Sequence, residues 1–239
     1  MYIAICLIAA KVIIDVGDVN DNAPVFEQDI YHLRIAEDEA LGKELLQLKA
    51  YGGDDKEVII YQMQASDDVA KYLSIDANSG LLKLASLLDF ETLEKFMVTV
   101  IATDSGKPPL SSTCEIDVEI LDINDNPPRF MQHIYRATVL ENMQRGTKVL
   151  ANDPDSEHFG RVSYLITNDA VGFTIGEDGW ITTTEMLDRE VKSTYRLTVK
   201  AVDGGTPPLS DSIIVEIEVE DENDNAPVFK HCNMTAVVQ

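Results

Sequence analysis

Carboxylate and amide side chains form the main chemical pattern in this sequence. The motif Asp-x-Asn-Asp-Asn occurs three times, beginning at Asp18, Asp122 and Asp221, and each copy is followed by proline and then by phenylalanine. Side-chain and backbone oxygens of this kind are ligands for hard cations such as Ca²⁺, which takes about six to eight of them. Five residues cannot supply so many, so we expect further ligands from elsewhere in the chain.

Two other kinds of metal site do not fit the motif. An EF-hand loop needs Gly at its sixth position and Glu at its twelfth, whereas here the sixth residue is Ala or Pro in every copy and the twelfth is Asp29, His133 or Cys232. Zinc and copper sites favour Cys, His or Met ligands, and the motif offers oxygens only. The pattern therefore favours calcium in a site that is not an EF-hand.

More acids recur in phase with the motif, at matching places in the two intervals between its copies. Each interval has an early Glu, a Leu-Asp-x-Glu sequence, and an Asp before a Gly- and Pro-rich turn. These acids are Glu37, Asp89, Glu91 and Asp104 in the first interval and Glu141, Asp188, Glu190 and Asp203 in the second, which also has Asp153 and Asp155. A period of about 100 residues indicates two domains that are built alike.

The segments around these acids have the pattern of β-strands. Residues 112–121 and 212–220 alternate apolar and polar side chains, and residues 95–104 and 195–203 behave similarly with many β-branched residues. Turn sequences separate them, and residues 67–75 suit a single helical turn. About seven short strands per domain predict two antiparallel β-sandwiches, in which acids at turns and strand ends gather at the two poles.

Composition excludes some classes of function. The 239 residues include 42 acidic and 19 basic side chains, a net charge of −23, and 45% are apolar. The apolar content suffices for packed cores and excludes a disordered acidic chain. The charge argues against nucleic acid as a partner, because a phosphate backbone requires Lys and Arg. No segment has the length and apolarity of a membrane span, so we expect no anchor within this chain.

The remaining sequence features are less specific. Cys6, Cys114 and Cys232 match no metal or redox spacing, so we expect lone thiols. Asn233 begins an Asn-x-Thr sequence and is a candidate glycosylation site. Residues 1–17 match the strands that lead into the other two motifs, and we interpret them as the last strand of a preceding repeat, with a signal peptide as the alternative.

From about Lys11 onward, the sequence resembles cadherin repeats. The resemblance rests on the early Glu, the Leu-Asp-x-Glu sequences, "ATDSGKPPLS" and "AVDGGTPPLS", and the motif with its Pro and Phe, all in the same order. It implies an all-β fold of tandem seven-stranded Greek-key β-sandwiches with immunoglobulin-like topology, joined end to end. On this basis residues 18–125 and 126–225 are repeats, residues 1–17 end a truncated preceding repeat, and residues 226–239 begin a truncated following one.

The resemblance also implies three Ca²⁺ ions at the central linker. The first ion is assigned to Glu37, Asp89, Glu91 and Asp125. The second is assigned to Glu37, Glu91, Asp122, Asp125 and Asp155, with the Ile123 carbonyl. The third is assigned to Asn124, Asp153, Asp155 and Asp203, with the Asn126 and Phe159 carbonyls.

The two outer linkers are expected to be incomplete, since each lacks the ligands of a neighbouring repeat. The linker before the first repeat offers Asp18, Asn20, Asp21, Asn22, Asp54 and Asp104. The linker after the second repeat offers Glu141, Asp188, Glu190, Asp221, Asn223 and Asp224. Gly52 replaces the first Asp of the family's Asp-x-Asp pair, so we expect the third ion of the first linker to bind weakly or not at all.

The function implied by the resemblance is calcium binding within a cell-surface adhesion protein. Ca²⁺ at the linkers would stiffen the ectodomain of a membrane-anchored parent for calcium-dependent, homophilic or heterophilic adhesion to other cadherin molecules. Insertion of an N-terminal Trp into a partner is not expected, because the only Trp is Trp180.

Two alternatives stay open at this point. A calcium-stiffened extracellular scaffold without adhesion fits the same residues. A secreted glycosidase could use one of the Asp-x-Glu pairs as its two carboxylates, but an active site is seldom duplicated in this way. We expect no enzymatic activity.

Overall fold

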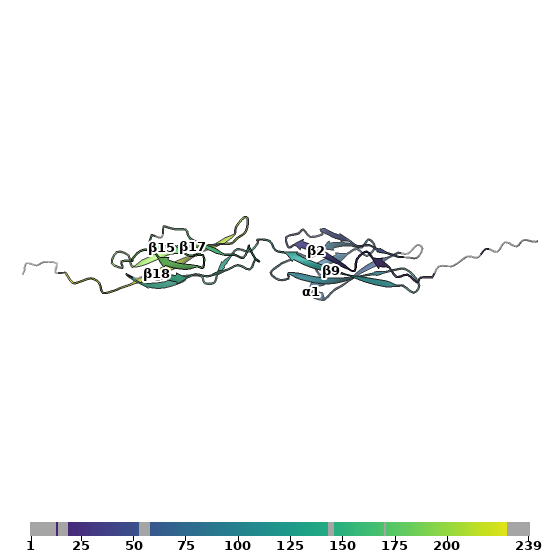
Figure 1. The fold of residues 1–239 in the computed structure, drawn as a ribbon, viewed down its shortest axis with the longest axis horizontal. Coiled ribbons are helices and arrows are strands. Elements are labelled where there is room, and N and C mark those ends of the chain that lie inside the picture. The colour runs from purple at the N-terminus through teal and green to yellow at the C-terminus, as the bar shows by residue number, and fades with distance from the viewer. Residues whose placement is uncertain (1–12, 14–18, 53–57, 143–145, 170, 229–239) are drawn as a thin grey trace, which may run out of the picture. The chain divides into compact units, whose positions relative to one another are not determined.

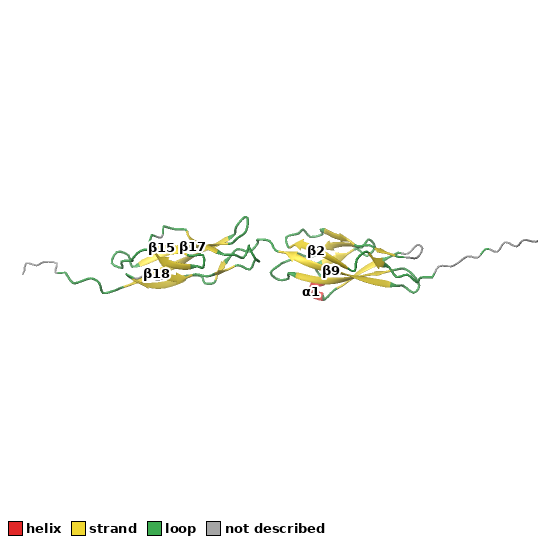
Figure 2. Cartoon of the chain, viewed as in Figure 1, coloured by secondary structure: helices red, strands yellow, loops and turns green. Residues whose placement is uncertain are grey.

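The computed structural model describes residues 13, 19–52, 58–142, 146–169 and 171–228. The chain divides into two compact units, residues 1–122 (unit 1) and residues 123–239 (unit 2). Strands form almost all of the regular structure (Figure 2), and the one helix among the described residues, α1 (Asp67–Ala70), is a single turn where the sequence predicted one. The predicted all-β class is confirmed.

Unit 1 is a sandwich of a four-stranded and a three-stranded sheet, with a small two-stranded pair (Figure 1). The strand orders are β2-β9-β8-β5, β3-β7-β6 and β1-β4. The bounds are β1 Val25–Phe26, β2 Ile30–Ala36, β3 Glu44–Gln47, β4 Ala50–Tyr51, β5 Ile60–Gln64, β6 Leu73–Ile75, β7 Leu81–Leu84, β8 Lys95–Thr103 and β9 Ser111–Leu121.

Unit 2 repeats this arrangement strand for strand. Its orders are β11-β18-β17-β14, β12-β16-β15 and β10-β13. The bounds are β10 Arg129–Phe130, β11 Tyr135–Leu140, β12 Gly146–Lys148, β13 Ala151–Asn152, β14 Ser163–Ile166, β15 Phe173–Ile175, β16 Trp180–Thr183, β17 Thr194–Val202 and β18 Ser210–Glu220. The two units therefore place matching motif residues at matching strand ends.

One pair of strands in each unit departs from the antiparallel prediction. Strand β2 pairs parallel with β9, and β11 pairs parallel with β18. The reason is a change of sheet: β1 pairs with β4, and the chain then crosses over to β2, which reaches the edge of β9 while running in the same direction. A parallel pair requires such a crossover, which alternating side chains cannot reveal.

Each unit has its own hydrophobic core, built from the inward side chains of the long strands. In β9, Ile116, Val118 and Ile120 are buried, whereas the intervening residues are exposed or half-buried. In β18, Val215 and Ile217 have the same role. This alternation is the period-2 pattern of a half-buried strand.

A tyrosine packs in each core in the same way, and it is buried in unit 1 and half-buried in unit 2. The Tyr61 hydroxyl accepts a hydrogen bond from the Ala50 amide at 2.9 Å, and the Tyr164 hydroxyl accepts one from the Ala151 amide at 2.9 Å. The ring of Phe26 packs against Tyr61, and that of Phe130 packs against Tyr164, with centroids 6.3 Å apart in both pairs. Both phenylalanines thus pack into the cores of their units.

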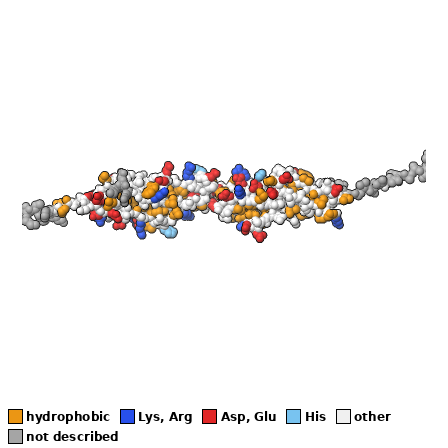
Figure 3. Space-filling view, turned by 60° about the horizontal axis from the view of Figure 1, so that its bottom comes forward, with side chains coloured by type: hydrophobic (Ala, Val, Ile, Leu, Met, Phe, Trp, Pro, Cys, Tyr) orange, Lys and Arg blue, Asp and Glu red, His pale blue; other side chains and the backbone are white. Residues whose placement is uncertain are grey.

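The surface carries charges of both signs. On the face drawn in Figure 3, acidic and basic side chains are scattered over both units, with no broad basic patch. Cys114 is a buried free thiol, and burial raises its pKa to about 11. Phe229, Cys6 and Cys232 lie outside the described residues.

Candidate metal centre

The best-defined acidic site lies at the end of unit 2 where β11 and β18 finish. We call Glu141, Asp188, Glu190, Asp221 and Asp224 the second acid cluster. Glu141 directly follows β11, and its amide donates to the Glu220 carbonyl at 3.1 Å, which extends the parallel pairing by one residue. The last strand thus places Glu141 beside the motif that begins at Asp221.

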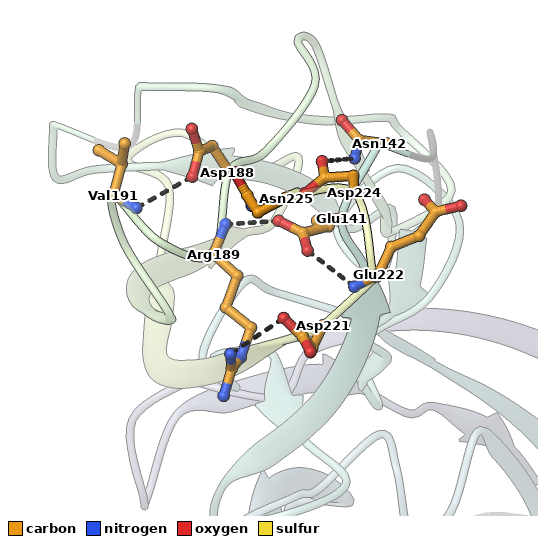
Figure 4. Close-up of polar contacts among 9 residues, drawn as sticks. All are labelled: Glu141, Asn142, Asp188, Arg189, Val191, Asp221, Glu222, Asp224 and Asn225. Carbon is orange, nitrogen blue, oxygen red and sulfur yellow. Dashed lines mark hydrogen bonds and ion pairs between the residues drawn. The ribbon is translucent and has the colours of Figure 1, made fainter. Parts of the chain in front are cut away.

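Backbone amides fix the Glu141 carboxylate. The Glu222 amide donates to Oε1 and the Arg189 amide donates to Oε2, both at 2.7 Å (Figure 4). Hydrogen bonds from Glu222 and Arg189 lower the pKa of Glu141, because they favour its charged form. The residue is only 1% exposed, so a buried negative charge is held at a fixed position.

Three carboxylates converge in this cluster. Ligand oxygens of Glu141, Glu190 and Asp224 lie within 4.8 Å of one another. Hydrogen bonds to neighbouring groups also hold the rest of the cluster: the Asn142 and Asn225 side chains donate to Asp224 at 2.9 and 2.7 Å, and the Val191 amide donates to Asp188 at 3.0 Å. A set of oxygens with this spacing suits a hard cation.

Asp221 has a different partner. The Arg189 guanidinium donates to its carboxylate, with Nη1 and Oδ1 3.2 Å apart (Figure 4). Arg189 therefore contacts the cluster twice, through its amide at Glu141 and through its side chain at Asp221.

Unit 1 has an equivalent group, which we call the first acid cluster: Glu37, Asp89, Glu91 and Asp122. The Phe90 amide donates to Glu37 Oε2 at 2.6 Å, and the Glu37 amide donates to the Leu121 carbonyl at 3.1 Å. Carboxylate oxygens of Glu91 lie within 4.8 Å of those of Glu37 and, separately, of Asp122.

Asp89 is also held by hydrogen bonds. The Thr92 hydroxyl and amide donate to its carboxylate at 2.9 and 3.1 Å. The hydroxyl hydrogen bond is the main cause of a lowered pKa of Asp89. The first and second acid clusters thus share a Glu that follows a strand and an Asp whose carboxylate accepts a hydrogen bond from the amide three residues later.

The opposite end of each unit places an asparagine of the motif against the Gly- and Pro-rich turn. In unit 1, Asn20 Nδ2 donates to Asp104 Oδ1 at 3.1 Å and to the Pro108 carbonyl at 2.6 Å. Burial raises the pKa of Asp104, but hydrogen bonds from the Leu110 and Gly106 amides and from Asn20 outweigh it, so the pKa lies below its ordinary value. We call Asn20 and Asp104 the first asparagine site.

Unit 2 has the matching second asparagine site, Asn124 and Asp203. Asn124 Nδ2 donates to the Pro207 carbonyl at 3.1 Å, and the Gly205 and Leu209 amides donate to Asp203 at 3.0 Å. A Cβ added at Gly205 would collide with the Asn124 amide group. Glycine therefore lets the Asn124 side chain approach this closely.

Asp155 and its neighbours complete this end of unit 2. The Asn126 amide donates to Asp155 Oδ2 at 3.3 Å, and the Asp155 amide donates to Asp153 Oδ1 at 3.1 Å. The Phe159 carbonyl accepts the Gly204 amide at 3.3 Å, and the Ile123 carbonyl accepts the Asp125 amide at 3.0 Å. Asn126 Nδ2 also donates to Asp125, at 2.6 Å.

Several oxygens at these asparagine sites provide a test of fit for a cation. Asn20 Oδ1, Asp104 Oδ2, Asn124 Oδ1 and Asp155 Oδ1 are buried and have no hydrogen-bond partner among the described residues. Buried polar atoms are normally satisfied, and a cation coordinated by oxygens would satisfy these. The residues present therefore fit Ca²⁺.

The sequence-predicted residues fall into three groups. Asp18, Asp54 and Asn233 lie outside the described residues. The acids and asparagines above are brought together within their own units, and in unit 1 Asn22 also donates to Asp21 at 2.7 Å. Asn223 is exposed. The central linker combines residues of both units, so its three-ion assignment stays a prediction.

Sequence reasoning missed Arg189, Asn142 and the two proline carbonyls. The Arg in "LDRE" was visible in the sequence, because it is the only basic residue that stands directly between two predicted ligands spaced two positions apart. Asn142 adopts a positive φ of 59°, which Asn tolerates better than most residues. The carbonyls of Pro108 and Pro207 carry no sequence signal of their own.

Comparison with known proteins bears directly on these sites. The Cadherin domain family model matches residues 31–121 and 135–220. The chain belongs to the cadherin family. Cadherin-4 of Caenorhabditis elegans is 44% identical over 241 residues, covering 96% of this cadherin chain but 6% of its own length. Human Protocadherin Fat 1 is 38% identical over 236 residues, covering 95% of the chain and 5% of its own length.

Solved structures agree with this assignment. Mouse Cadherin-23 EC22-24 has a TM-score of 0.79 at 29% identity, over 86% of this chain and 67% of that one. The extracellular domain of Protocadherin GammaB4 has a TM-score of 0.75 at 32% identity, over 86% of this chain and 35% of that one. The chain thus has the fold of cadherin extracellular repeats. Among the described residues, no helix is long and apolar enough to cross a bilayer.

Proposed function

We propose that this chain is a calcium-binding segment of a cell-surface adhesion protein, in which Ca²⁺ ions hold successive cadherin repeats in a fixed arrangement. The observation that carries the proposal is the Glu141 carboxylate. It is buried, kept charged by two backbone amides, and within 4.8 Å of two further carboxylates. Such a concentration of negative charge is stabilised by a bound divalent cation.

The central linker is proposed to bind three Ca²⁺ ions. Unit 1 contributes its first acid cluster, unit 2 contributes Asp125, Asp155 and the second asparagine site, and residues 122–126 connect them. The support is that each half is preorganised within its own unit by the hydrogen bonds described above. When bound, calcium would neutralise the acids and coordinate oxygens from both units. Without it, the acids repel one another and the linker is free to bend.

Extracellular calcium suits this chemistry. Extracellular modules bind Ca²⁺ with dissociation constants of about 10⁻⁴–10⁻³ M, so these sites would be filled outside the cell and largely empty in the cytosol. The proposed location is the cell surface, in a longer protein anchored in the membrane. The relatives are cadherins and protocadherins by name, and the proposed partners are other cadherin molecules.

Calorimetric calcium titration of the wild-type chain and of Asp125→Ala tests the linker. We expect the substitution to weaken calcium binding and to leave both units folded. Small-angle scattering with calcium and with a chelator should show a larger maximum dimension with calcium. An unchanged dimension, or loss of both melting transitions in Asp125→Ala, would contradict the proposal.

A separate experiment distinguishes adhesion by this segment from calcium-dependent stiffening of its linker. Beads coated with the chain should aggregate with calcium and disperse with chelator if this segment carries an adhesive surface. Calcium-dependent stiffening without bead aggregation would instead favour the extracellular scaffold.

A further inference from the structure

The one basic side chain that contacts the second acid cluster in the described structure raises a question about how calcium binds there. Arg189 stands between Asp188 and Glu190, and its guanidinium Nη1 lies 3.2 Å from Asp221 Oδ1. Figure 4 shows the side chain extending away from the Glu141 contact toward Asp221. Arg189 therefore brings one positive charge to the group of acids proposed to hold calcium.

Unit 1 lacks this charge at the matching position. Phe90 occupies it, and its half-buried ring packs against the core of unit 1 while its amide donates to Glu37. The first residue of the motif in unit 1, Asp122, has a carboxylate oxygen within 4.8 Å of Glu91. In unit 2, Asp221 is paired with Arg189.

We propose that Arg189 is an internal competitor of calcium, which occupies Asp221 when the second acid cluster is metal-free and lowers the affinity of that cluster for Ca²⁺. The inference rests on the proposed function, because it assumes that the cluster binds calcium. For Asp221 to become a ligand, its ion pair with the guanidinium must break. At the matching position of the first acid cluster, Phe90 brings no such charge.

The expected effect is modest. The side chains of Arg189 and Asp221 are 44% and 58% exposed, and exposed ion pairs contribute little because water screens them. Removing the charge should therefore tighten calcium binding at the second cluster by about threefold to fivefold. Neutralising Arg189 should leave the first acid cluster unchanged.

Amide signals make the test specific for each cluster. In a calcium titration of the ¹⁵N-labelled chain followed by NMR, the amides of Glu222 and residue 189 report on the second cluster, and that of Phe90 reports on the first. Arg189→Met should lower the apparent dissociation constant at the second cluster, whereas Arg189→Lys, which keeps the charge, should remain close to wild type. Equal constants for wild type and Arg189→Met would overturn the inference.

A calcium-free measurement tests the ion pair itself. In chelator, Asp221→Asn should shift the Arg189 guanidinium signals, and adding calcium to the wild-type chain should shift them in the same direction. Signals that respond to neither change would overturn the competition. If the Glu222 and Arg189 amides of the wild-type chain do not respond to calcium at all, the proposed function fails at this cluster and the competition fails with it.

Discussion

The two units share their strand arrangement and the way in which each acid cluster is held. They differ at the residue between the Asp and Glu of Leu-Asp-x-Glu. In both, the amide of that intervening residue donates to the carboxylate of the Glu that follows the first long strand, at 2.6 Å from Phe90 to Glu37 and 2.7 Å from Arg189 to Glu141. The amide hydrogen bond to the Glu carboxylate therefore does not depend on which side chain the intervening residue carries. The side chain is free to vary, and it packs on the core in one unit and pairs with Asp221 in the other.

Two kinds of feature therefore determine the acid clusters. Backbone amides and strand ends position the acids, and any sequence of the right pattern supplies them. Single side chains at the rim of each cluster are expected to adjust its affinity for calcium. Substitutions in matched pairs can show whether the two units differ only in these side chains.

The largest effect should come from removing the buried Glu of one cluster. Glu141→Ala should weaken calcium binding at the second acid cluster by at least ~100-fold, because loss of a ligand exceeds the 10–100-fold effect of losing an outer partner. Site-resolved NMR titration measures it. Glu37→Ala is the matched variant, and each substitution should spare the other unit's cluster. Equal weakening at both clusters would break the comparison.

The backbone at Asn142 offers a second contrast. Asn142→Ala should destabilise unit 2 by about 1–2 kcal/mol, since a left-handed conformation is unfavourable for Ala. Asn142→Gly should recover most of the loss. At Asp38, the matching position of unit 1, no positive φ occurs, and Asp38→Ala should change stability by less than about 0.5 kcal/mol. Urea unfolding followed by Trp180 fluorescence reports on unit 2, because it contains the only Trp, and unfolding followed by the NMR signals of unit 1 reports on Asp38→Ala.

The tyrosine hydroxyls test whether the scaffolds are equivalent. Tyr61→Phe and Tyr164→Phe each leave an amide without its acceptor, at a cost of about 1 kcal/mol. Hydrogen exchange of the Ala50 and Ala151 amides should accelerate in the corresponding variant only. A large effect in one unit and none in the other would show that the shared geometry does not carry the same energy.

The smallest expected effect is on how the stability of unit 2 depends on pH. Hydrogen bonds hold the pKa of Glu141 below its ordinary value of 4.5, so its charged form stabilises the folded unit above the pKa of the unfolded chain. That contribution is lost as the pH falls through the lowered pKa of the folded state. In chelator, Trp180-monitored unfolding of Glu141→Gln should therefore depend less on pH below about 4.5 than that of wild type. Parallel pH profiles would contradict this.

Much of the scaffold could be predicted from side-chain pattern. The alternation in residues 112–121 and 212–220 located β9 and β18 to within two residues, because strands with one buried face must alternate. The helical turn at residues 67–75 was also predicted, and α1 occupies its first part. Recurrence of Glu and Asp-x-Glu in phase with the motif identified the acids that the structure brings together within each unit.

What could not be predicted depends on the backbone and on side-chain direction. The parallel pairing of β2 with β9 follows from a crossover between sheets, and alternation is the same for parallel and antiparallel partners. The Asn20 and Asn124 contacts to proline carbonyls depend on the path of the turn. The pairing of Arg189 with Asp221 depends on which way a long side chain points, and spacing in the sequence does not determine that direction.

The parallel pairing of β2 with β9 also has a mechanical consequence. The chain enters β2 at one end of unit 1 and leaves β9 at the other. Tension applied through the flanking segments therefore slides the two strands along each other, and the hydrogen bonds between them share the load instead of opening one at a time. The same holds for β11 and β18 in unit 2. Each unit is thus built to bear a pulling force along its strands.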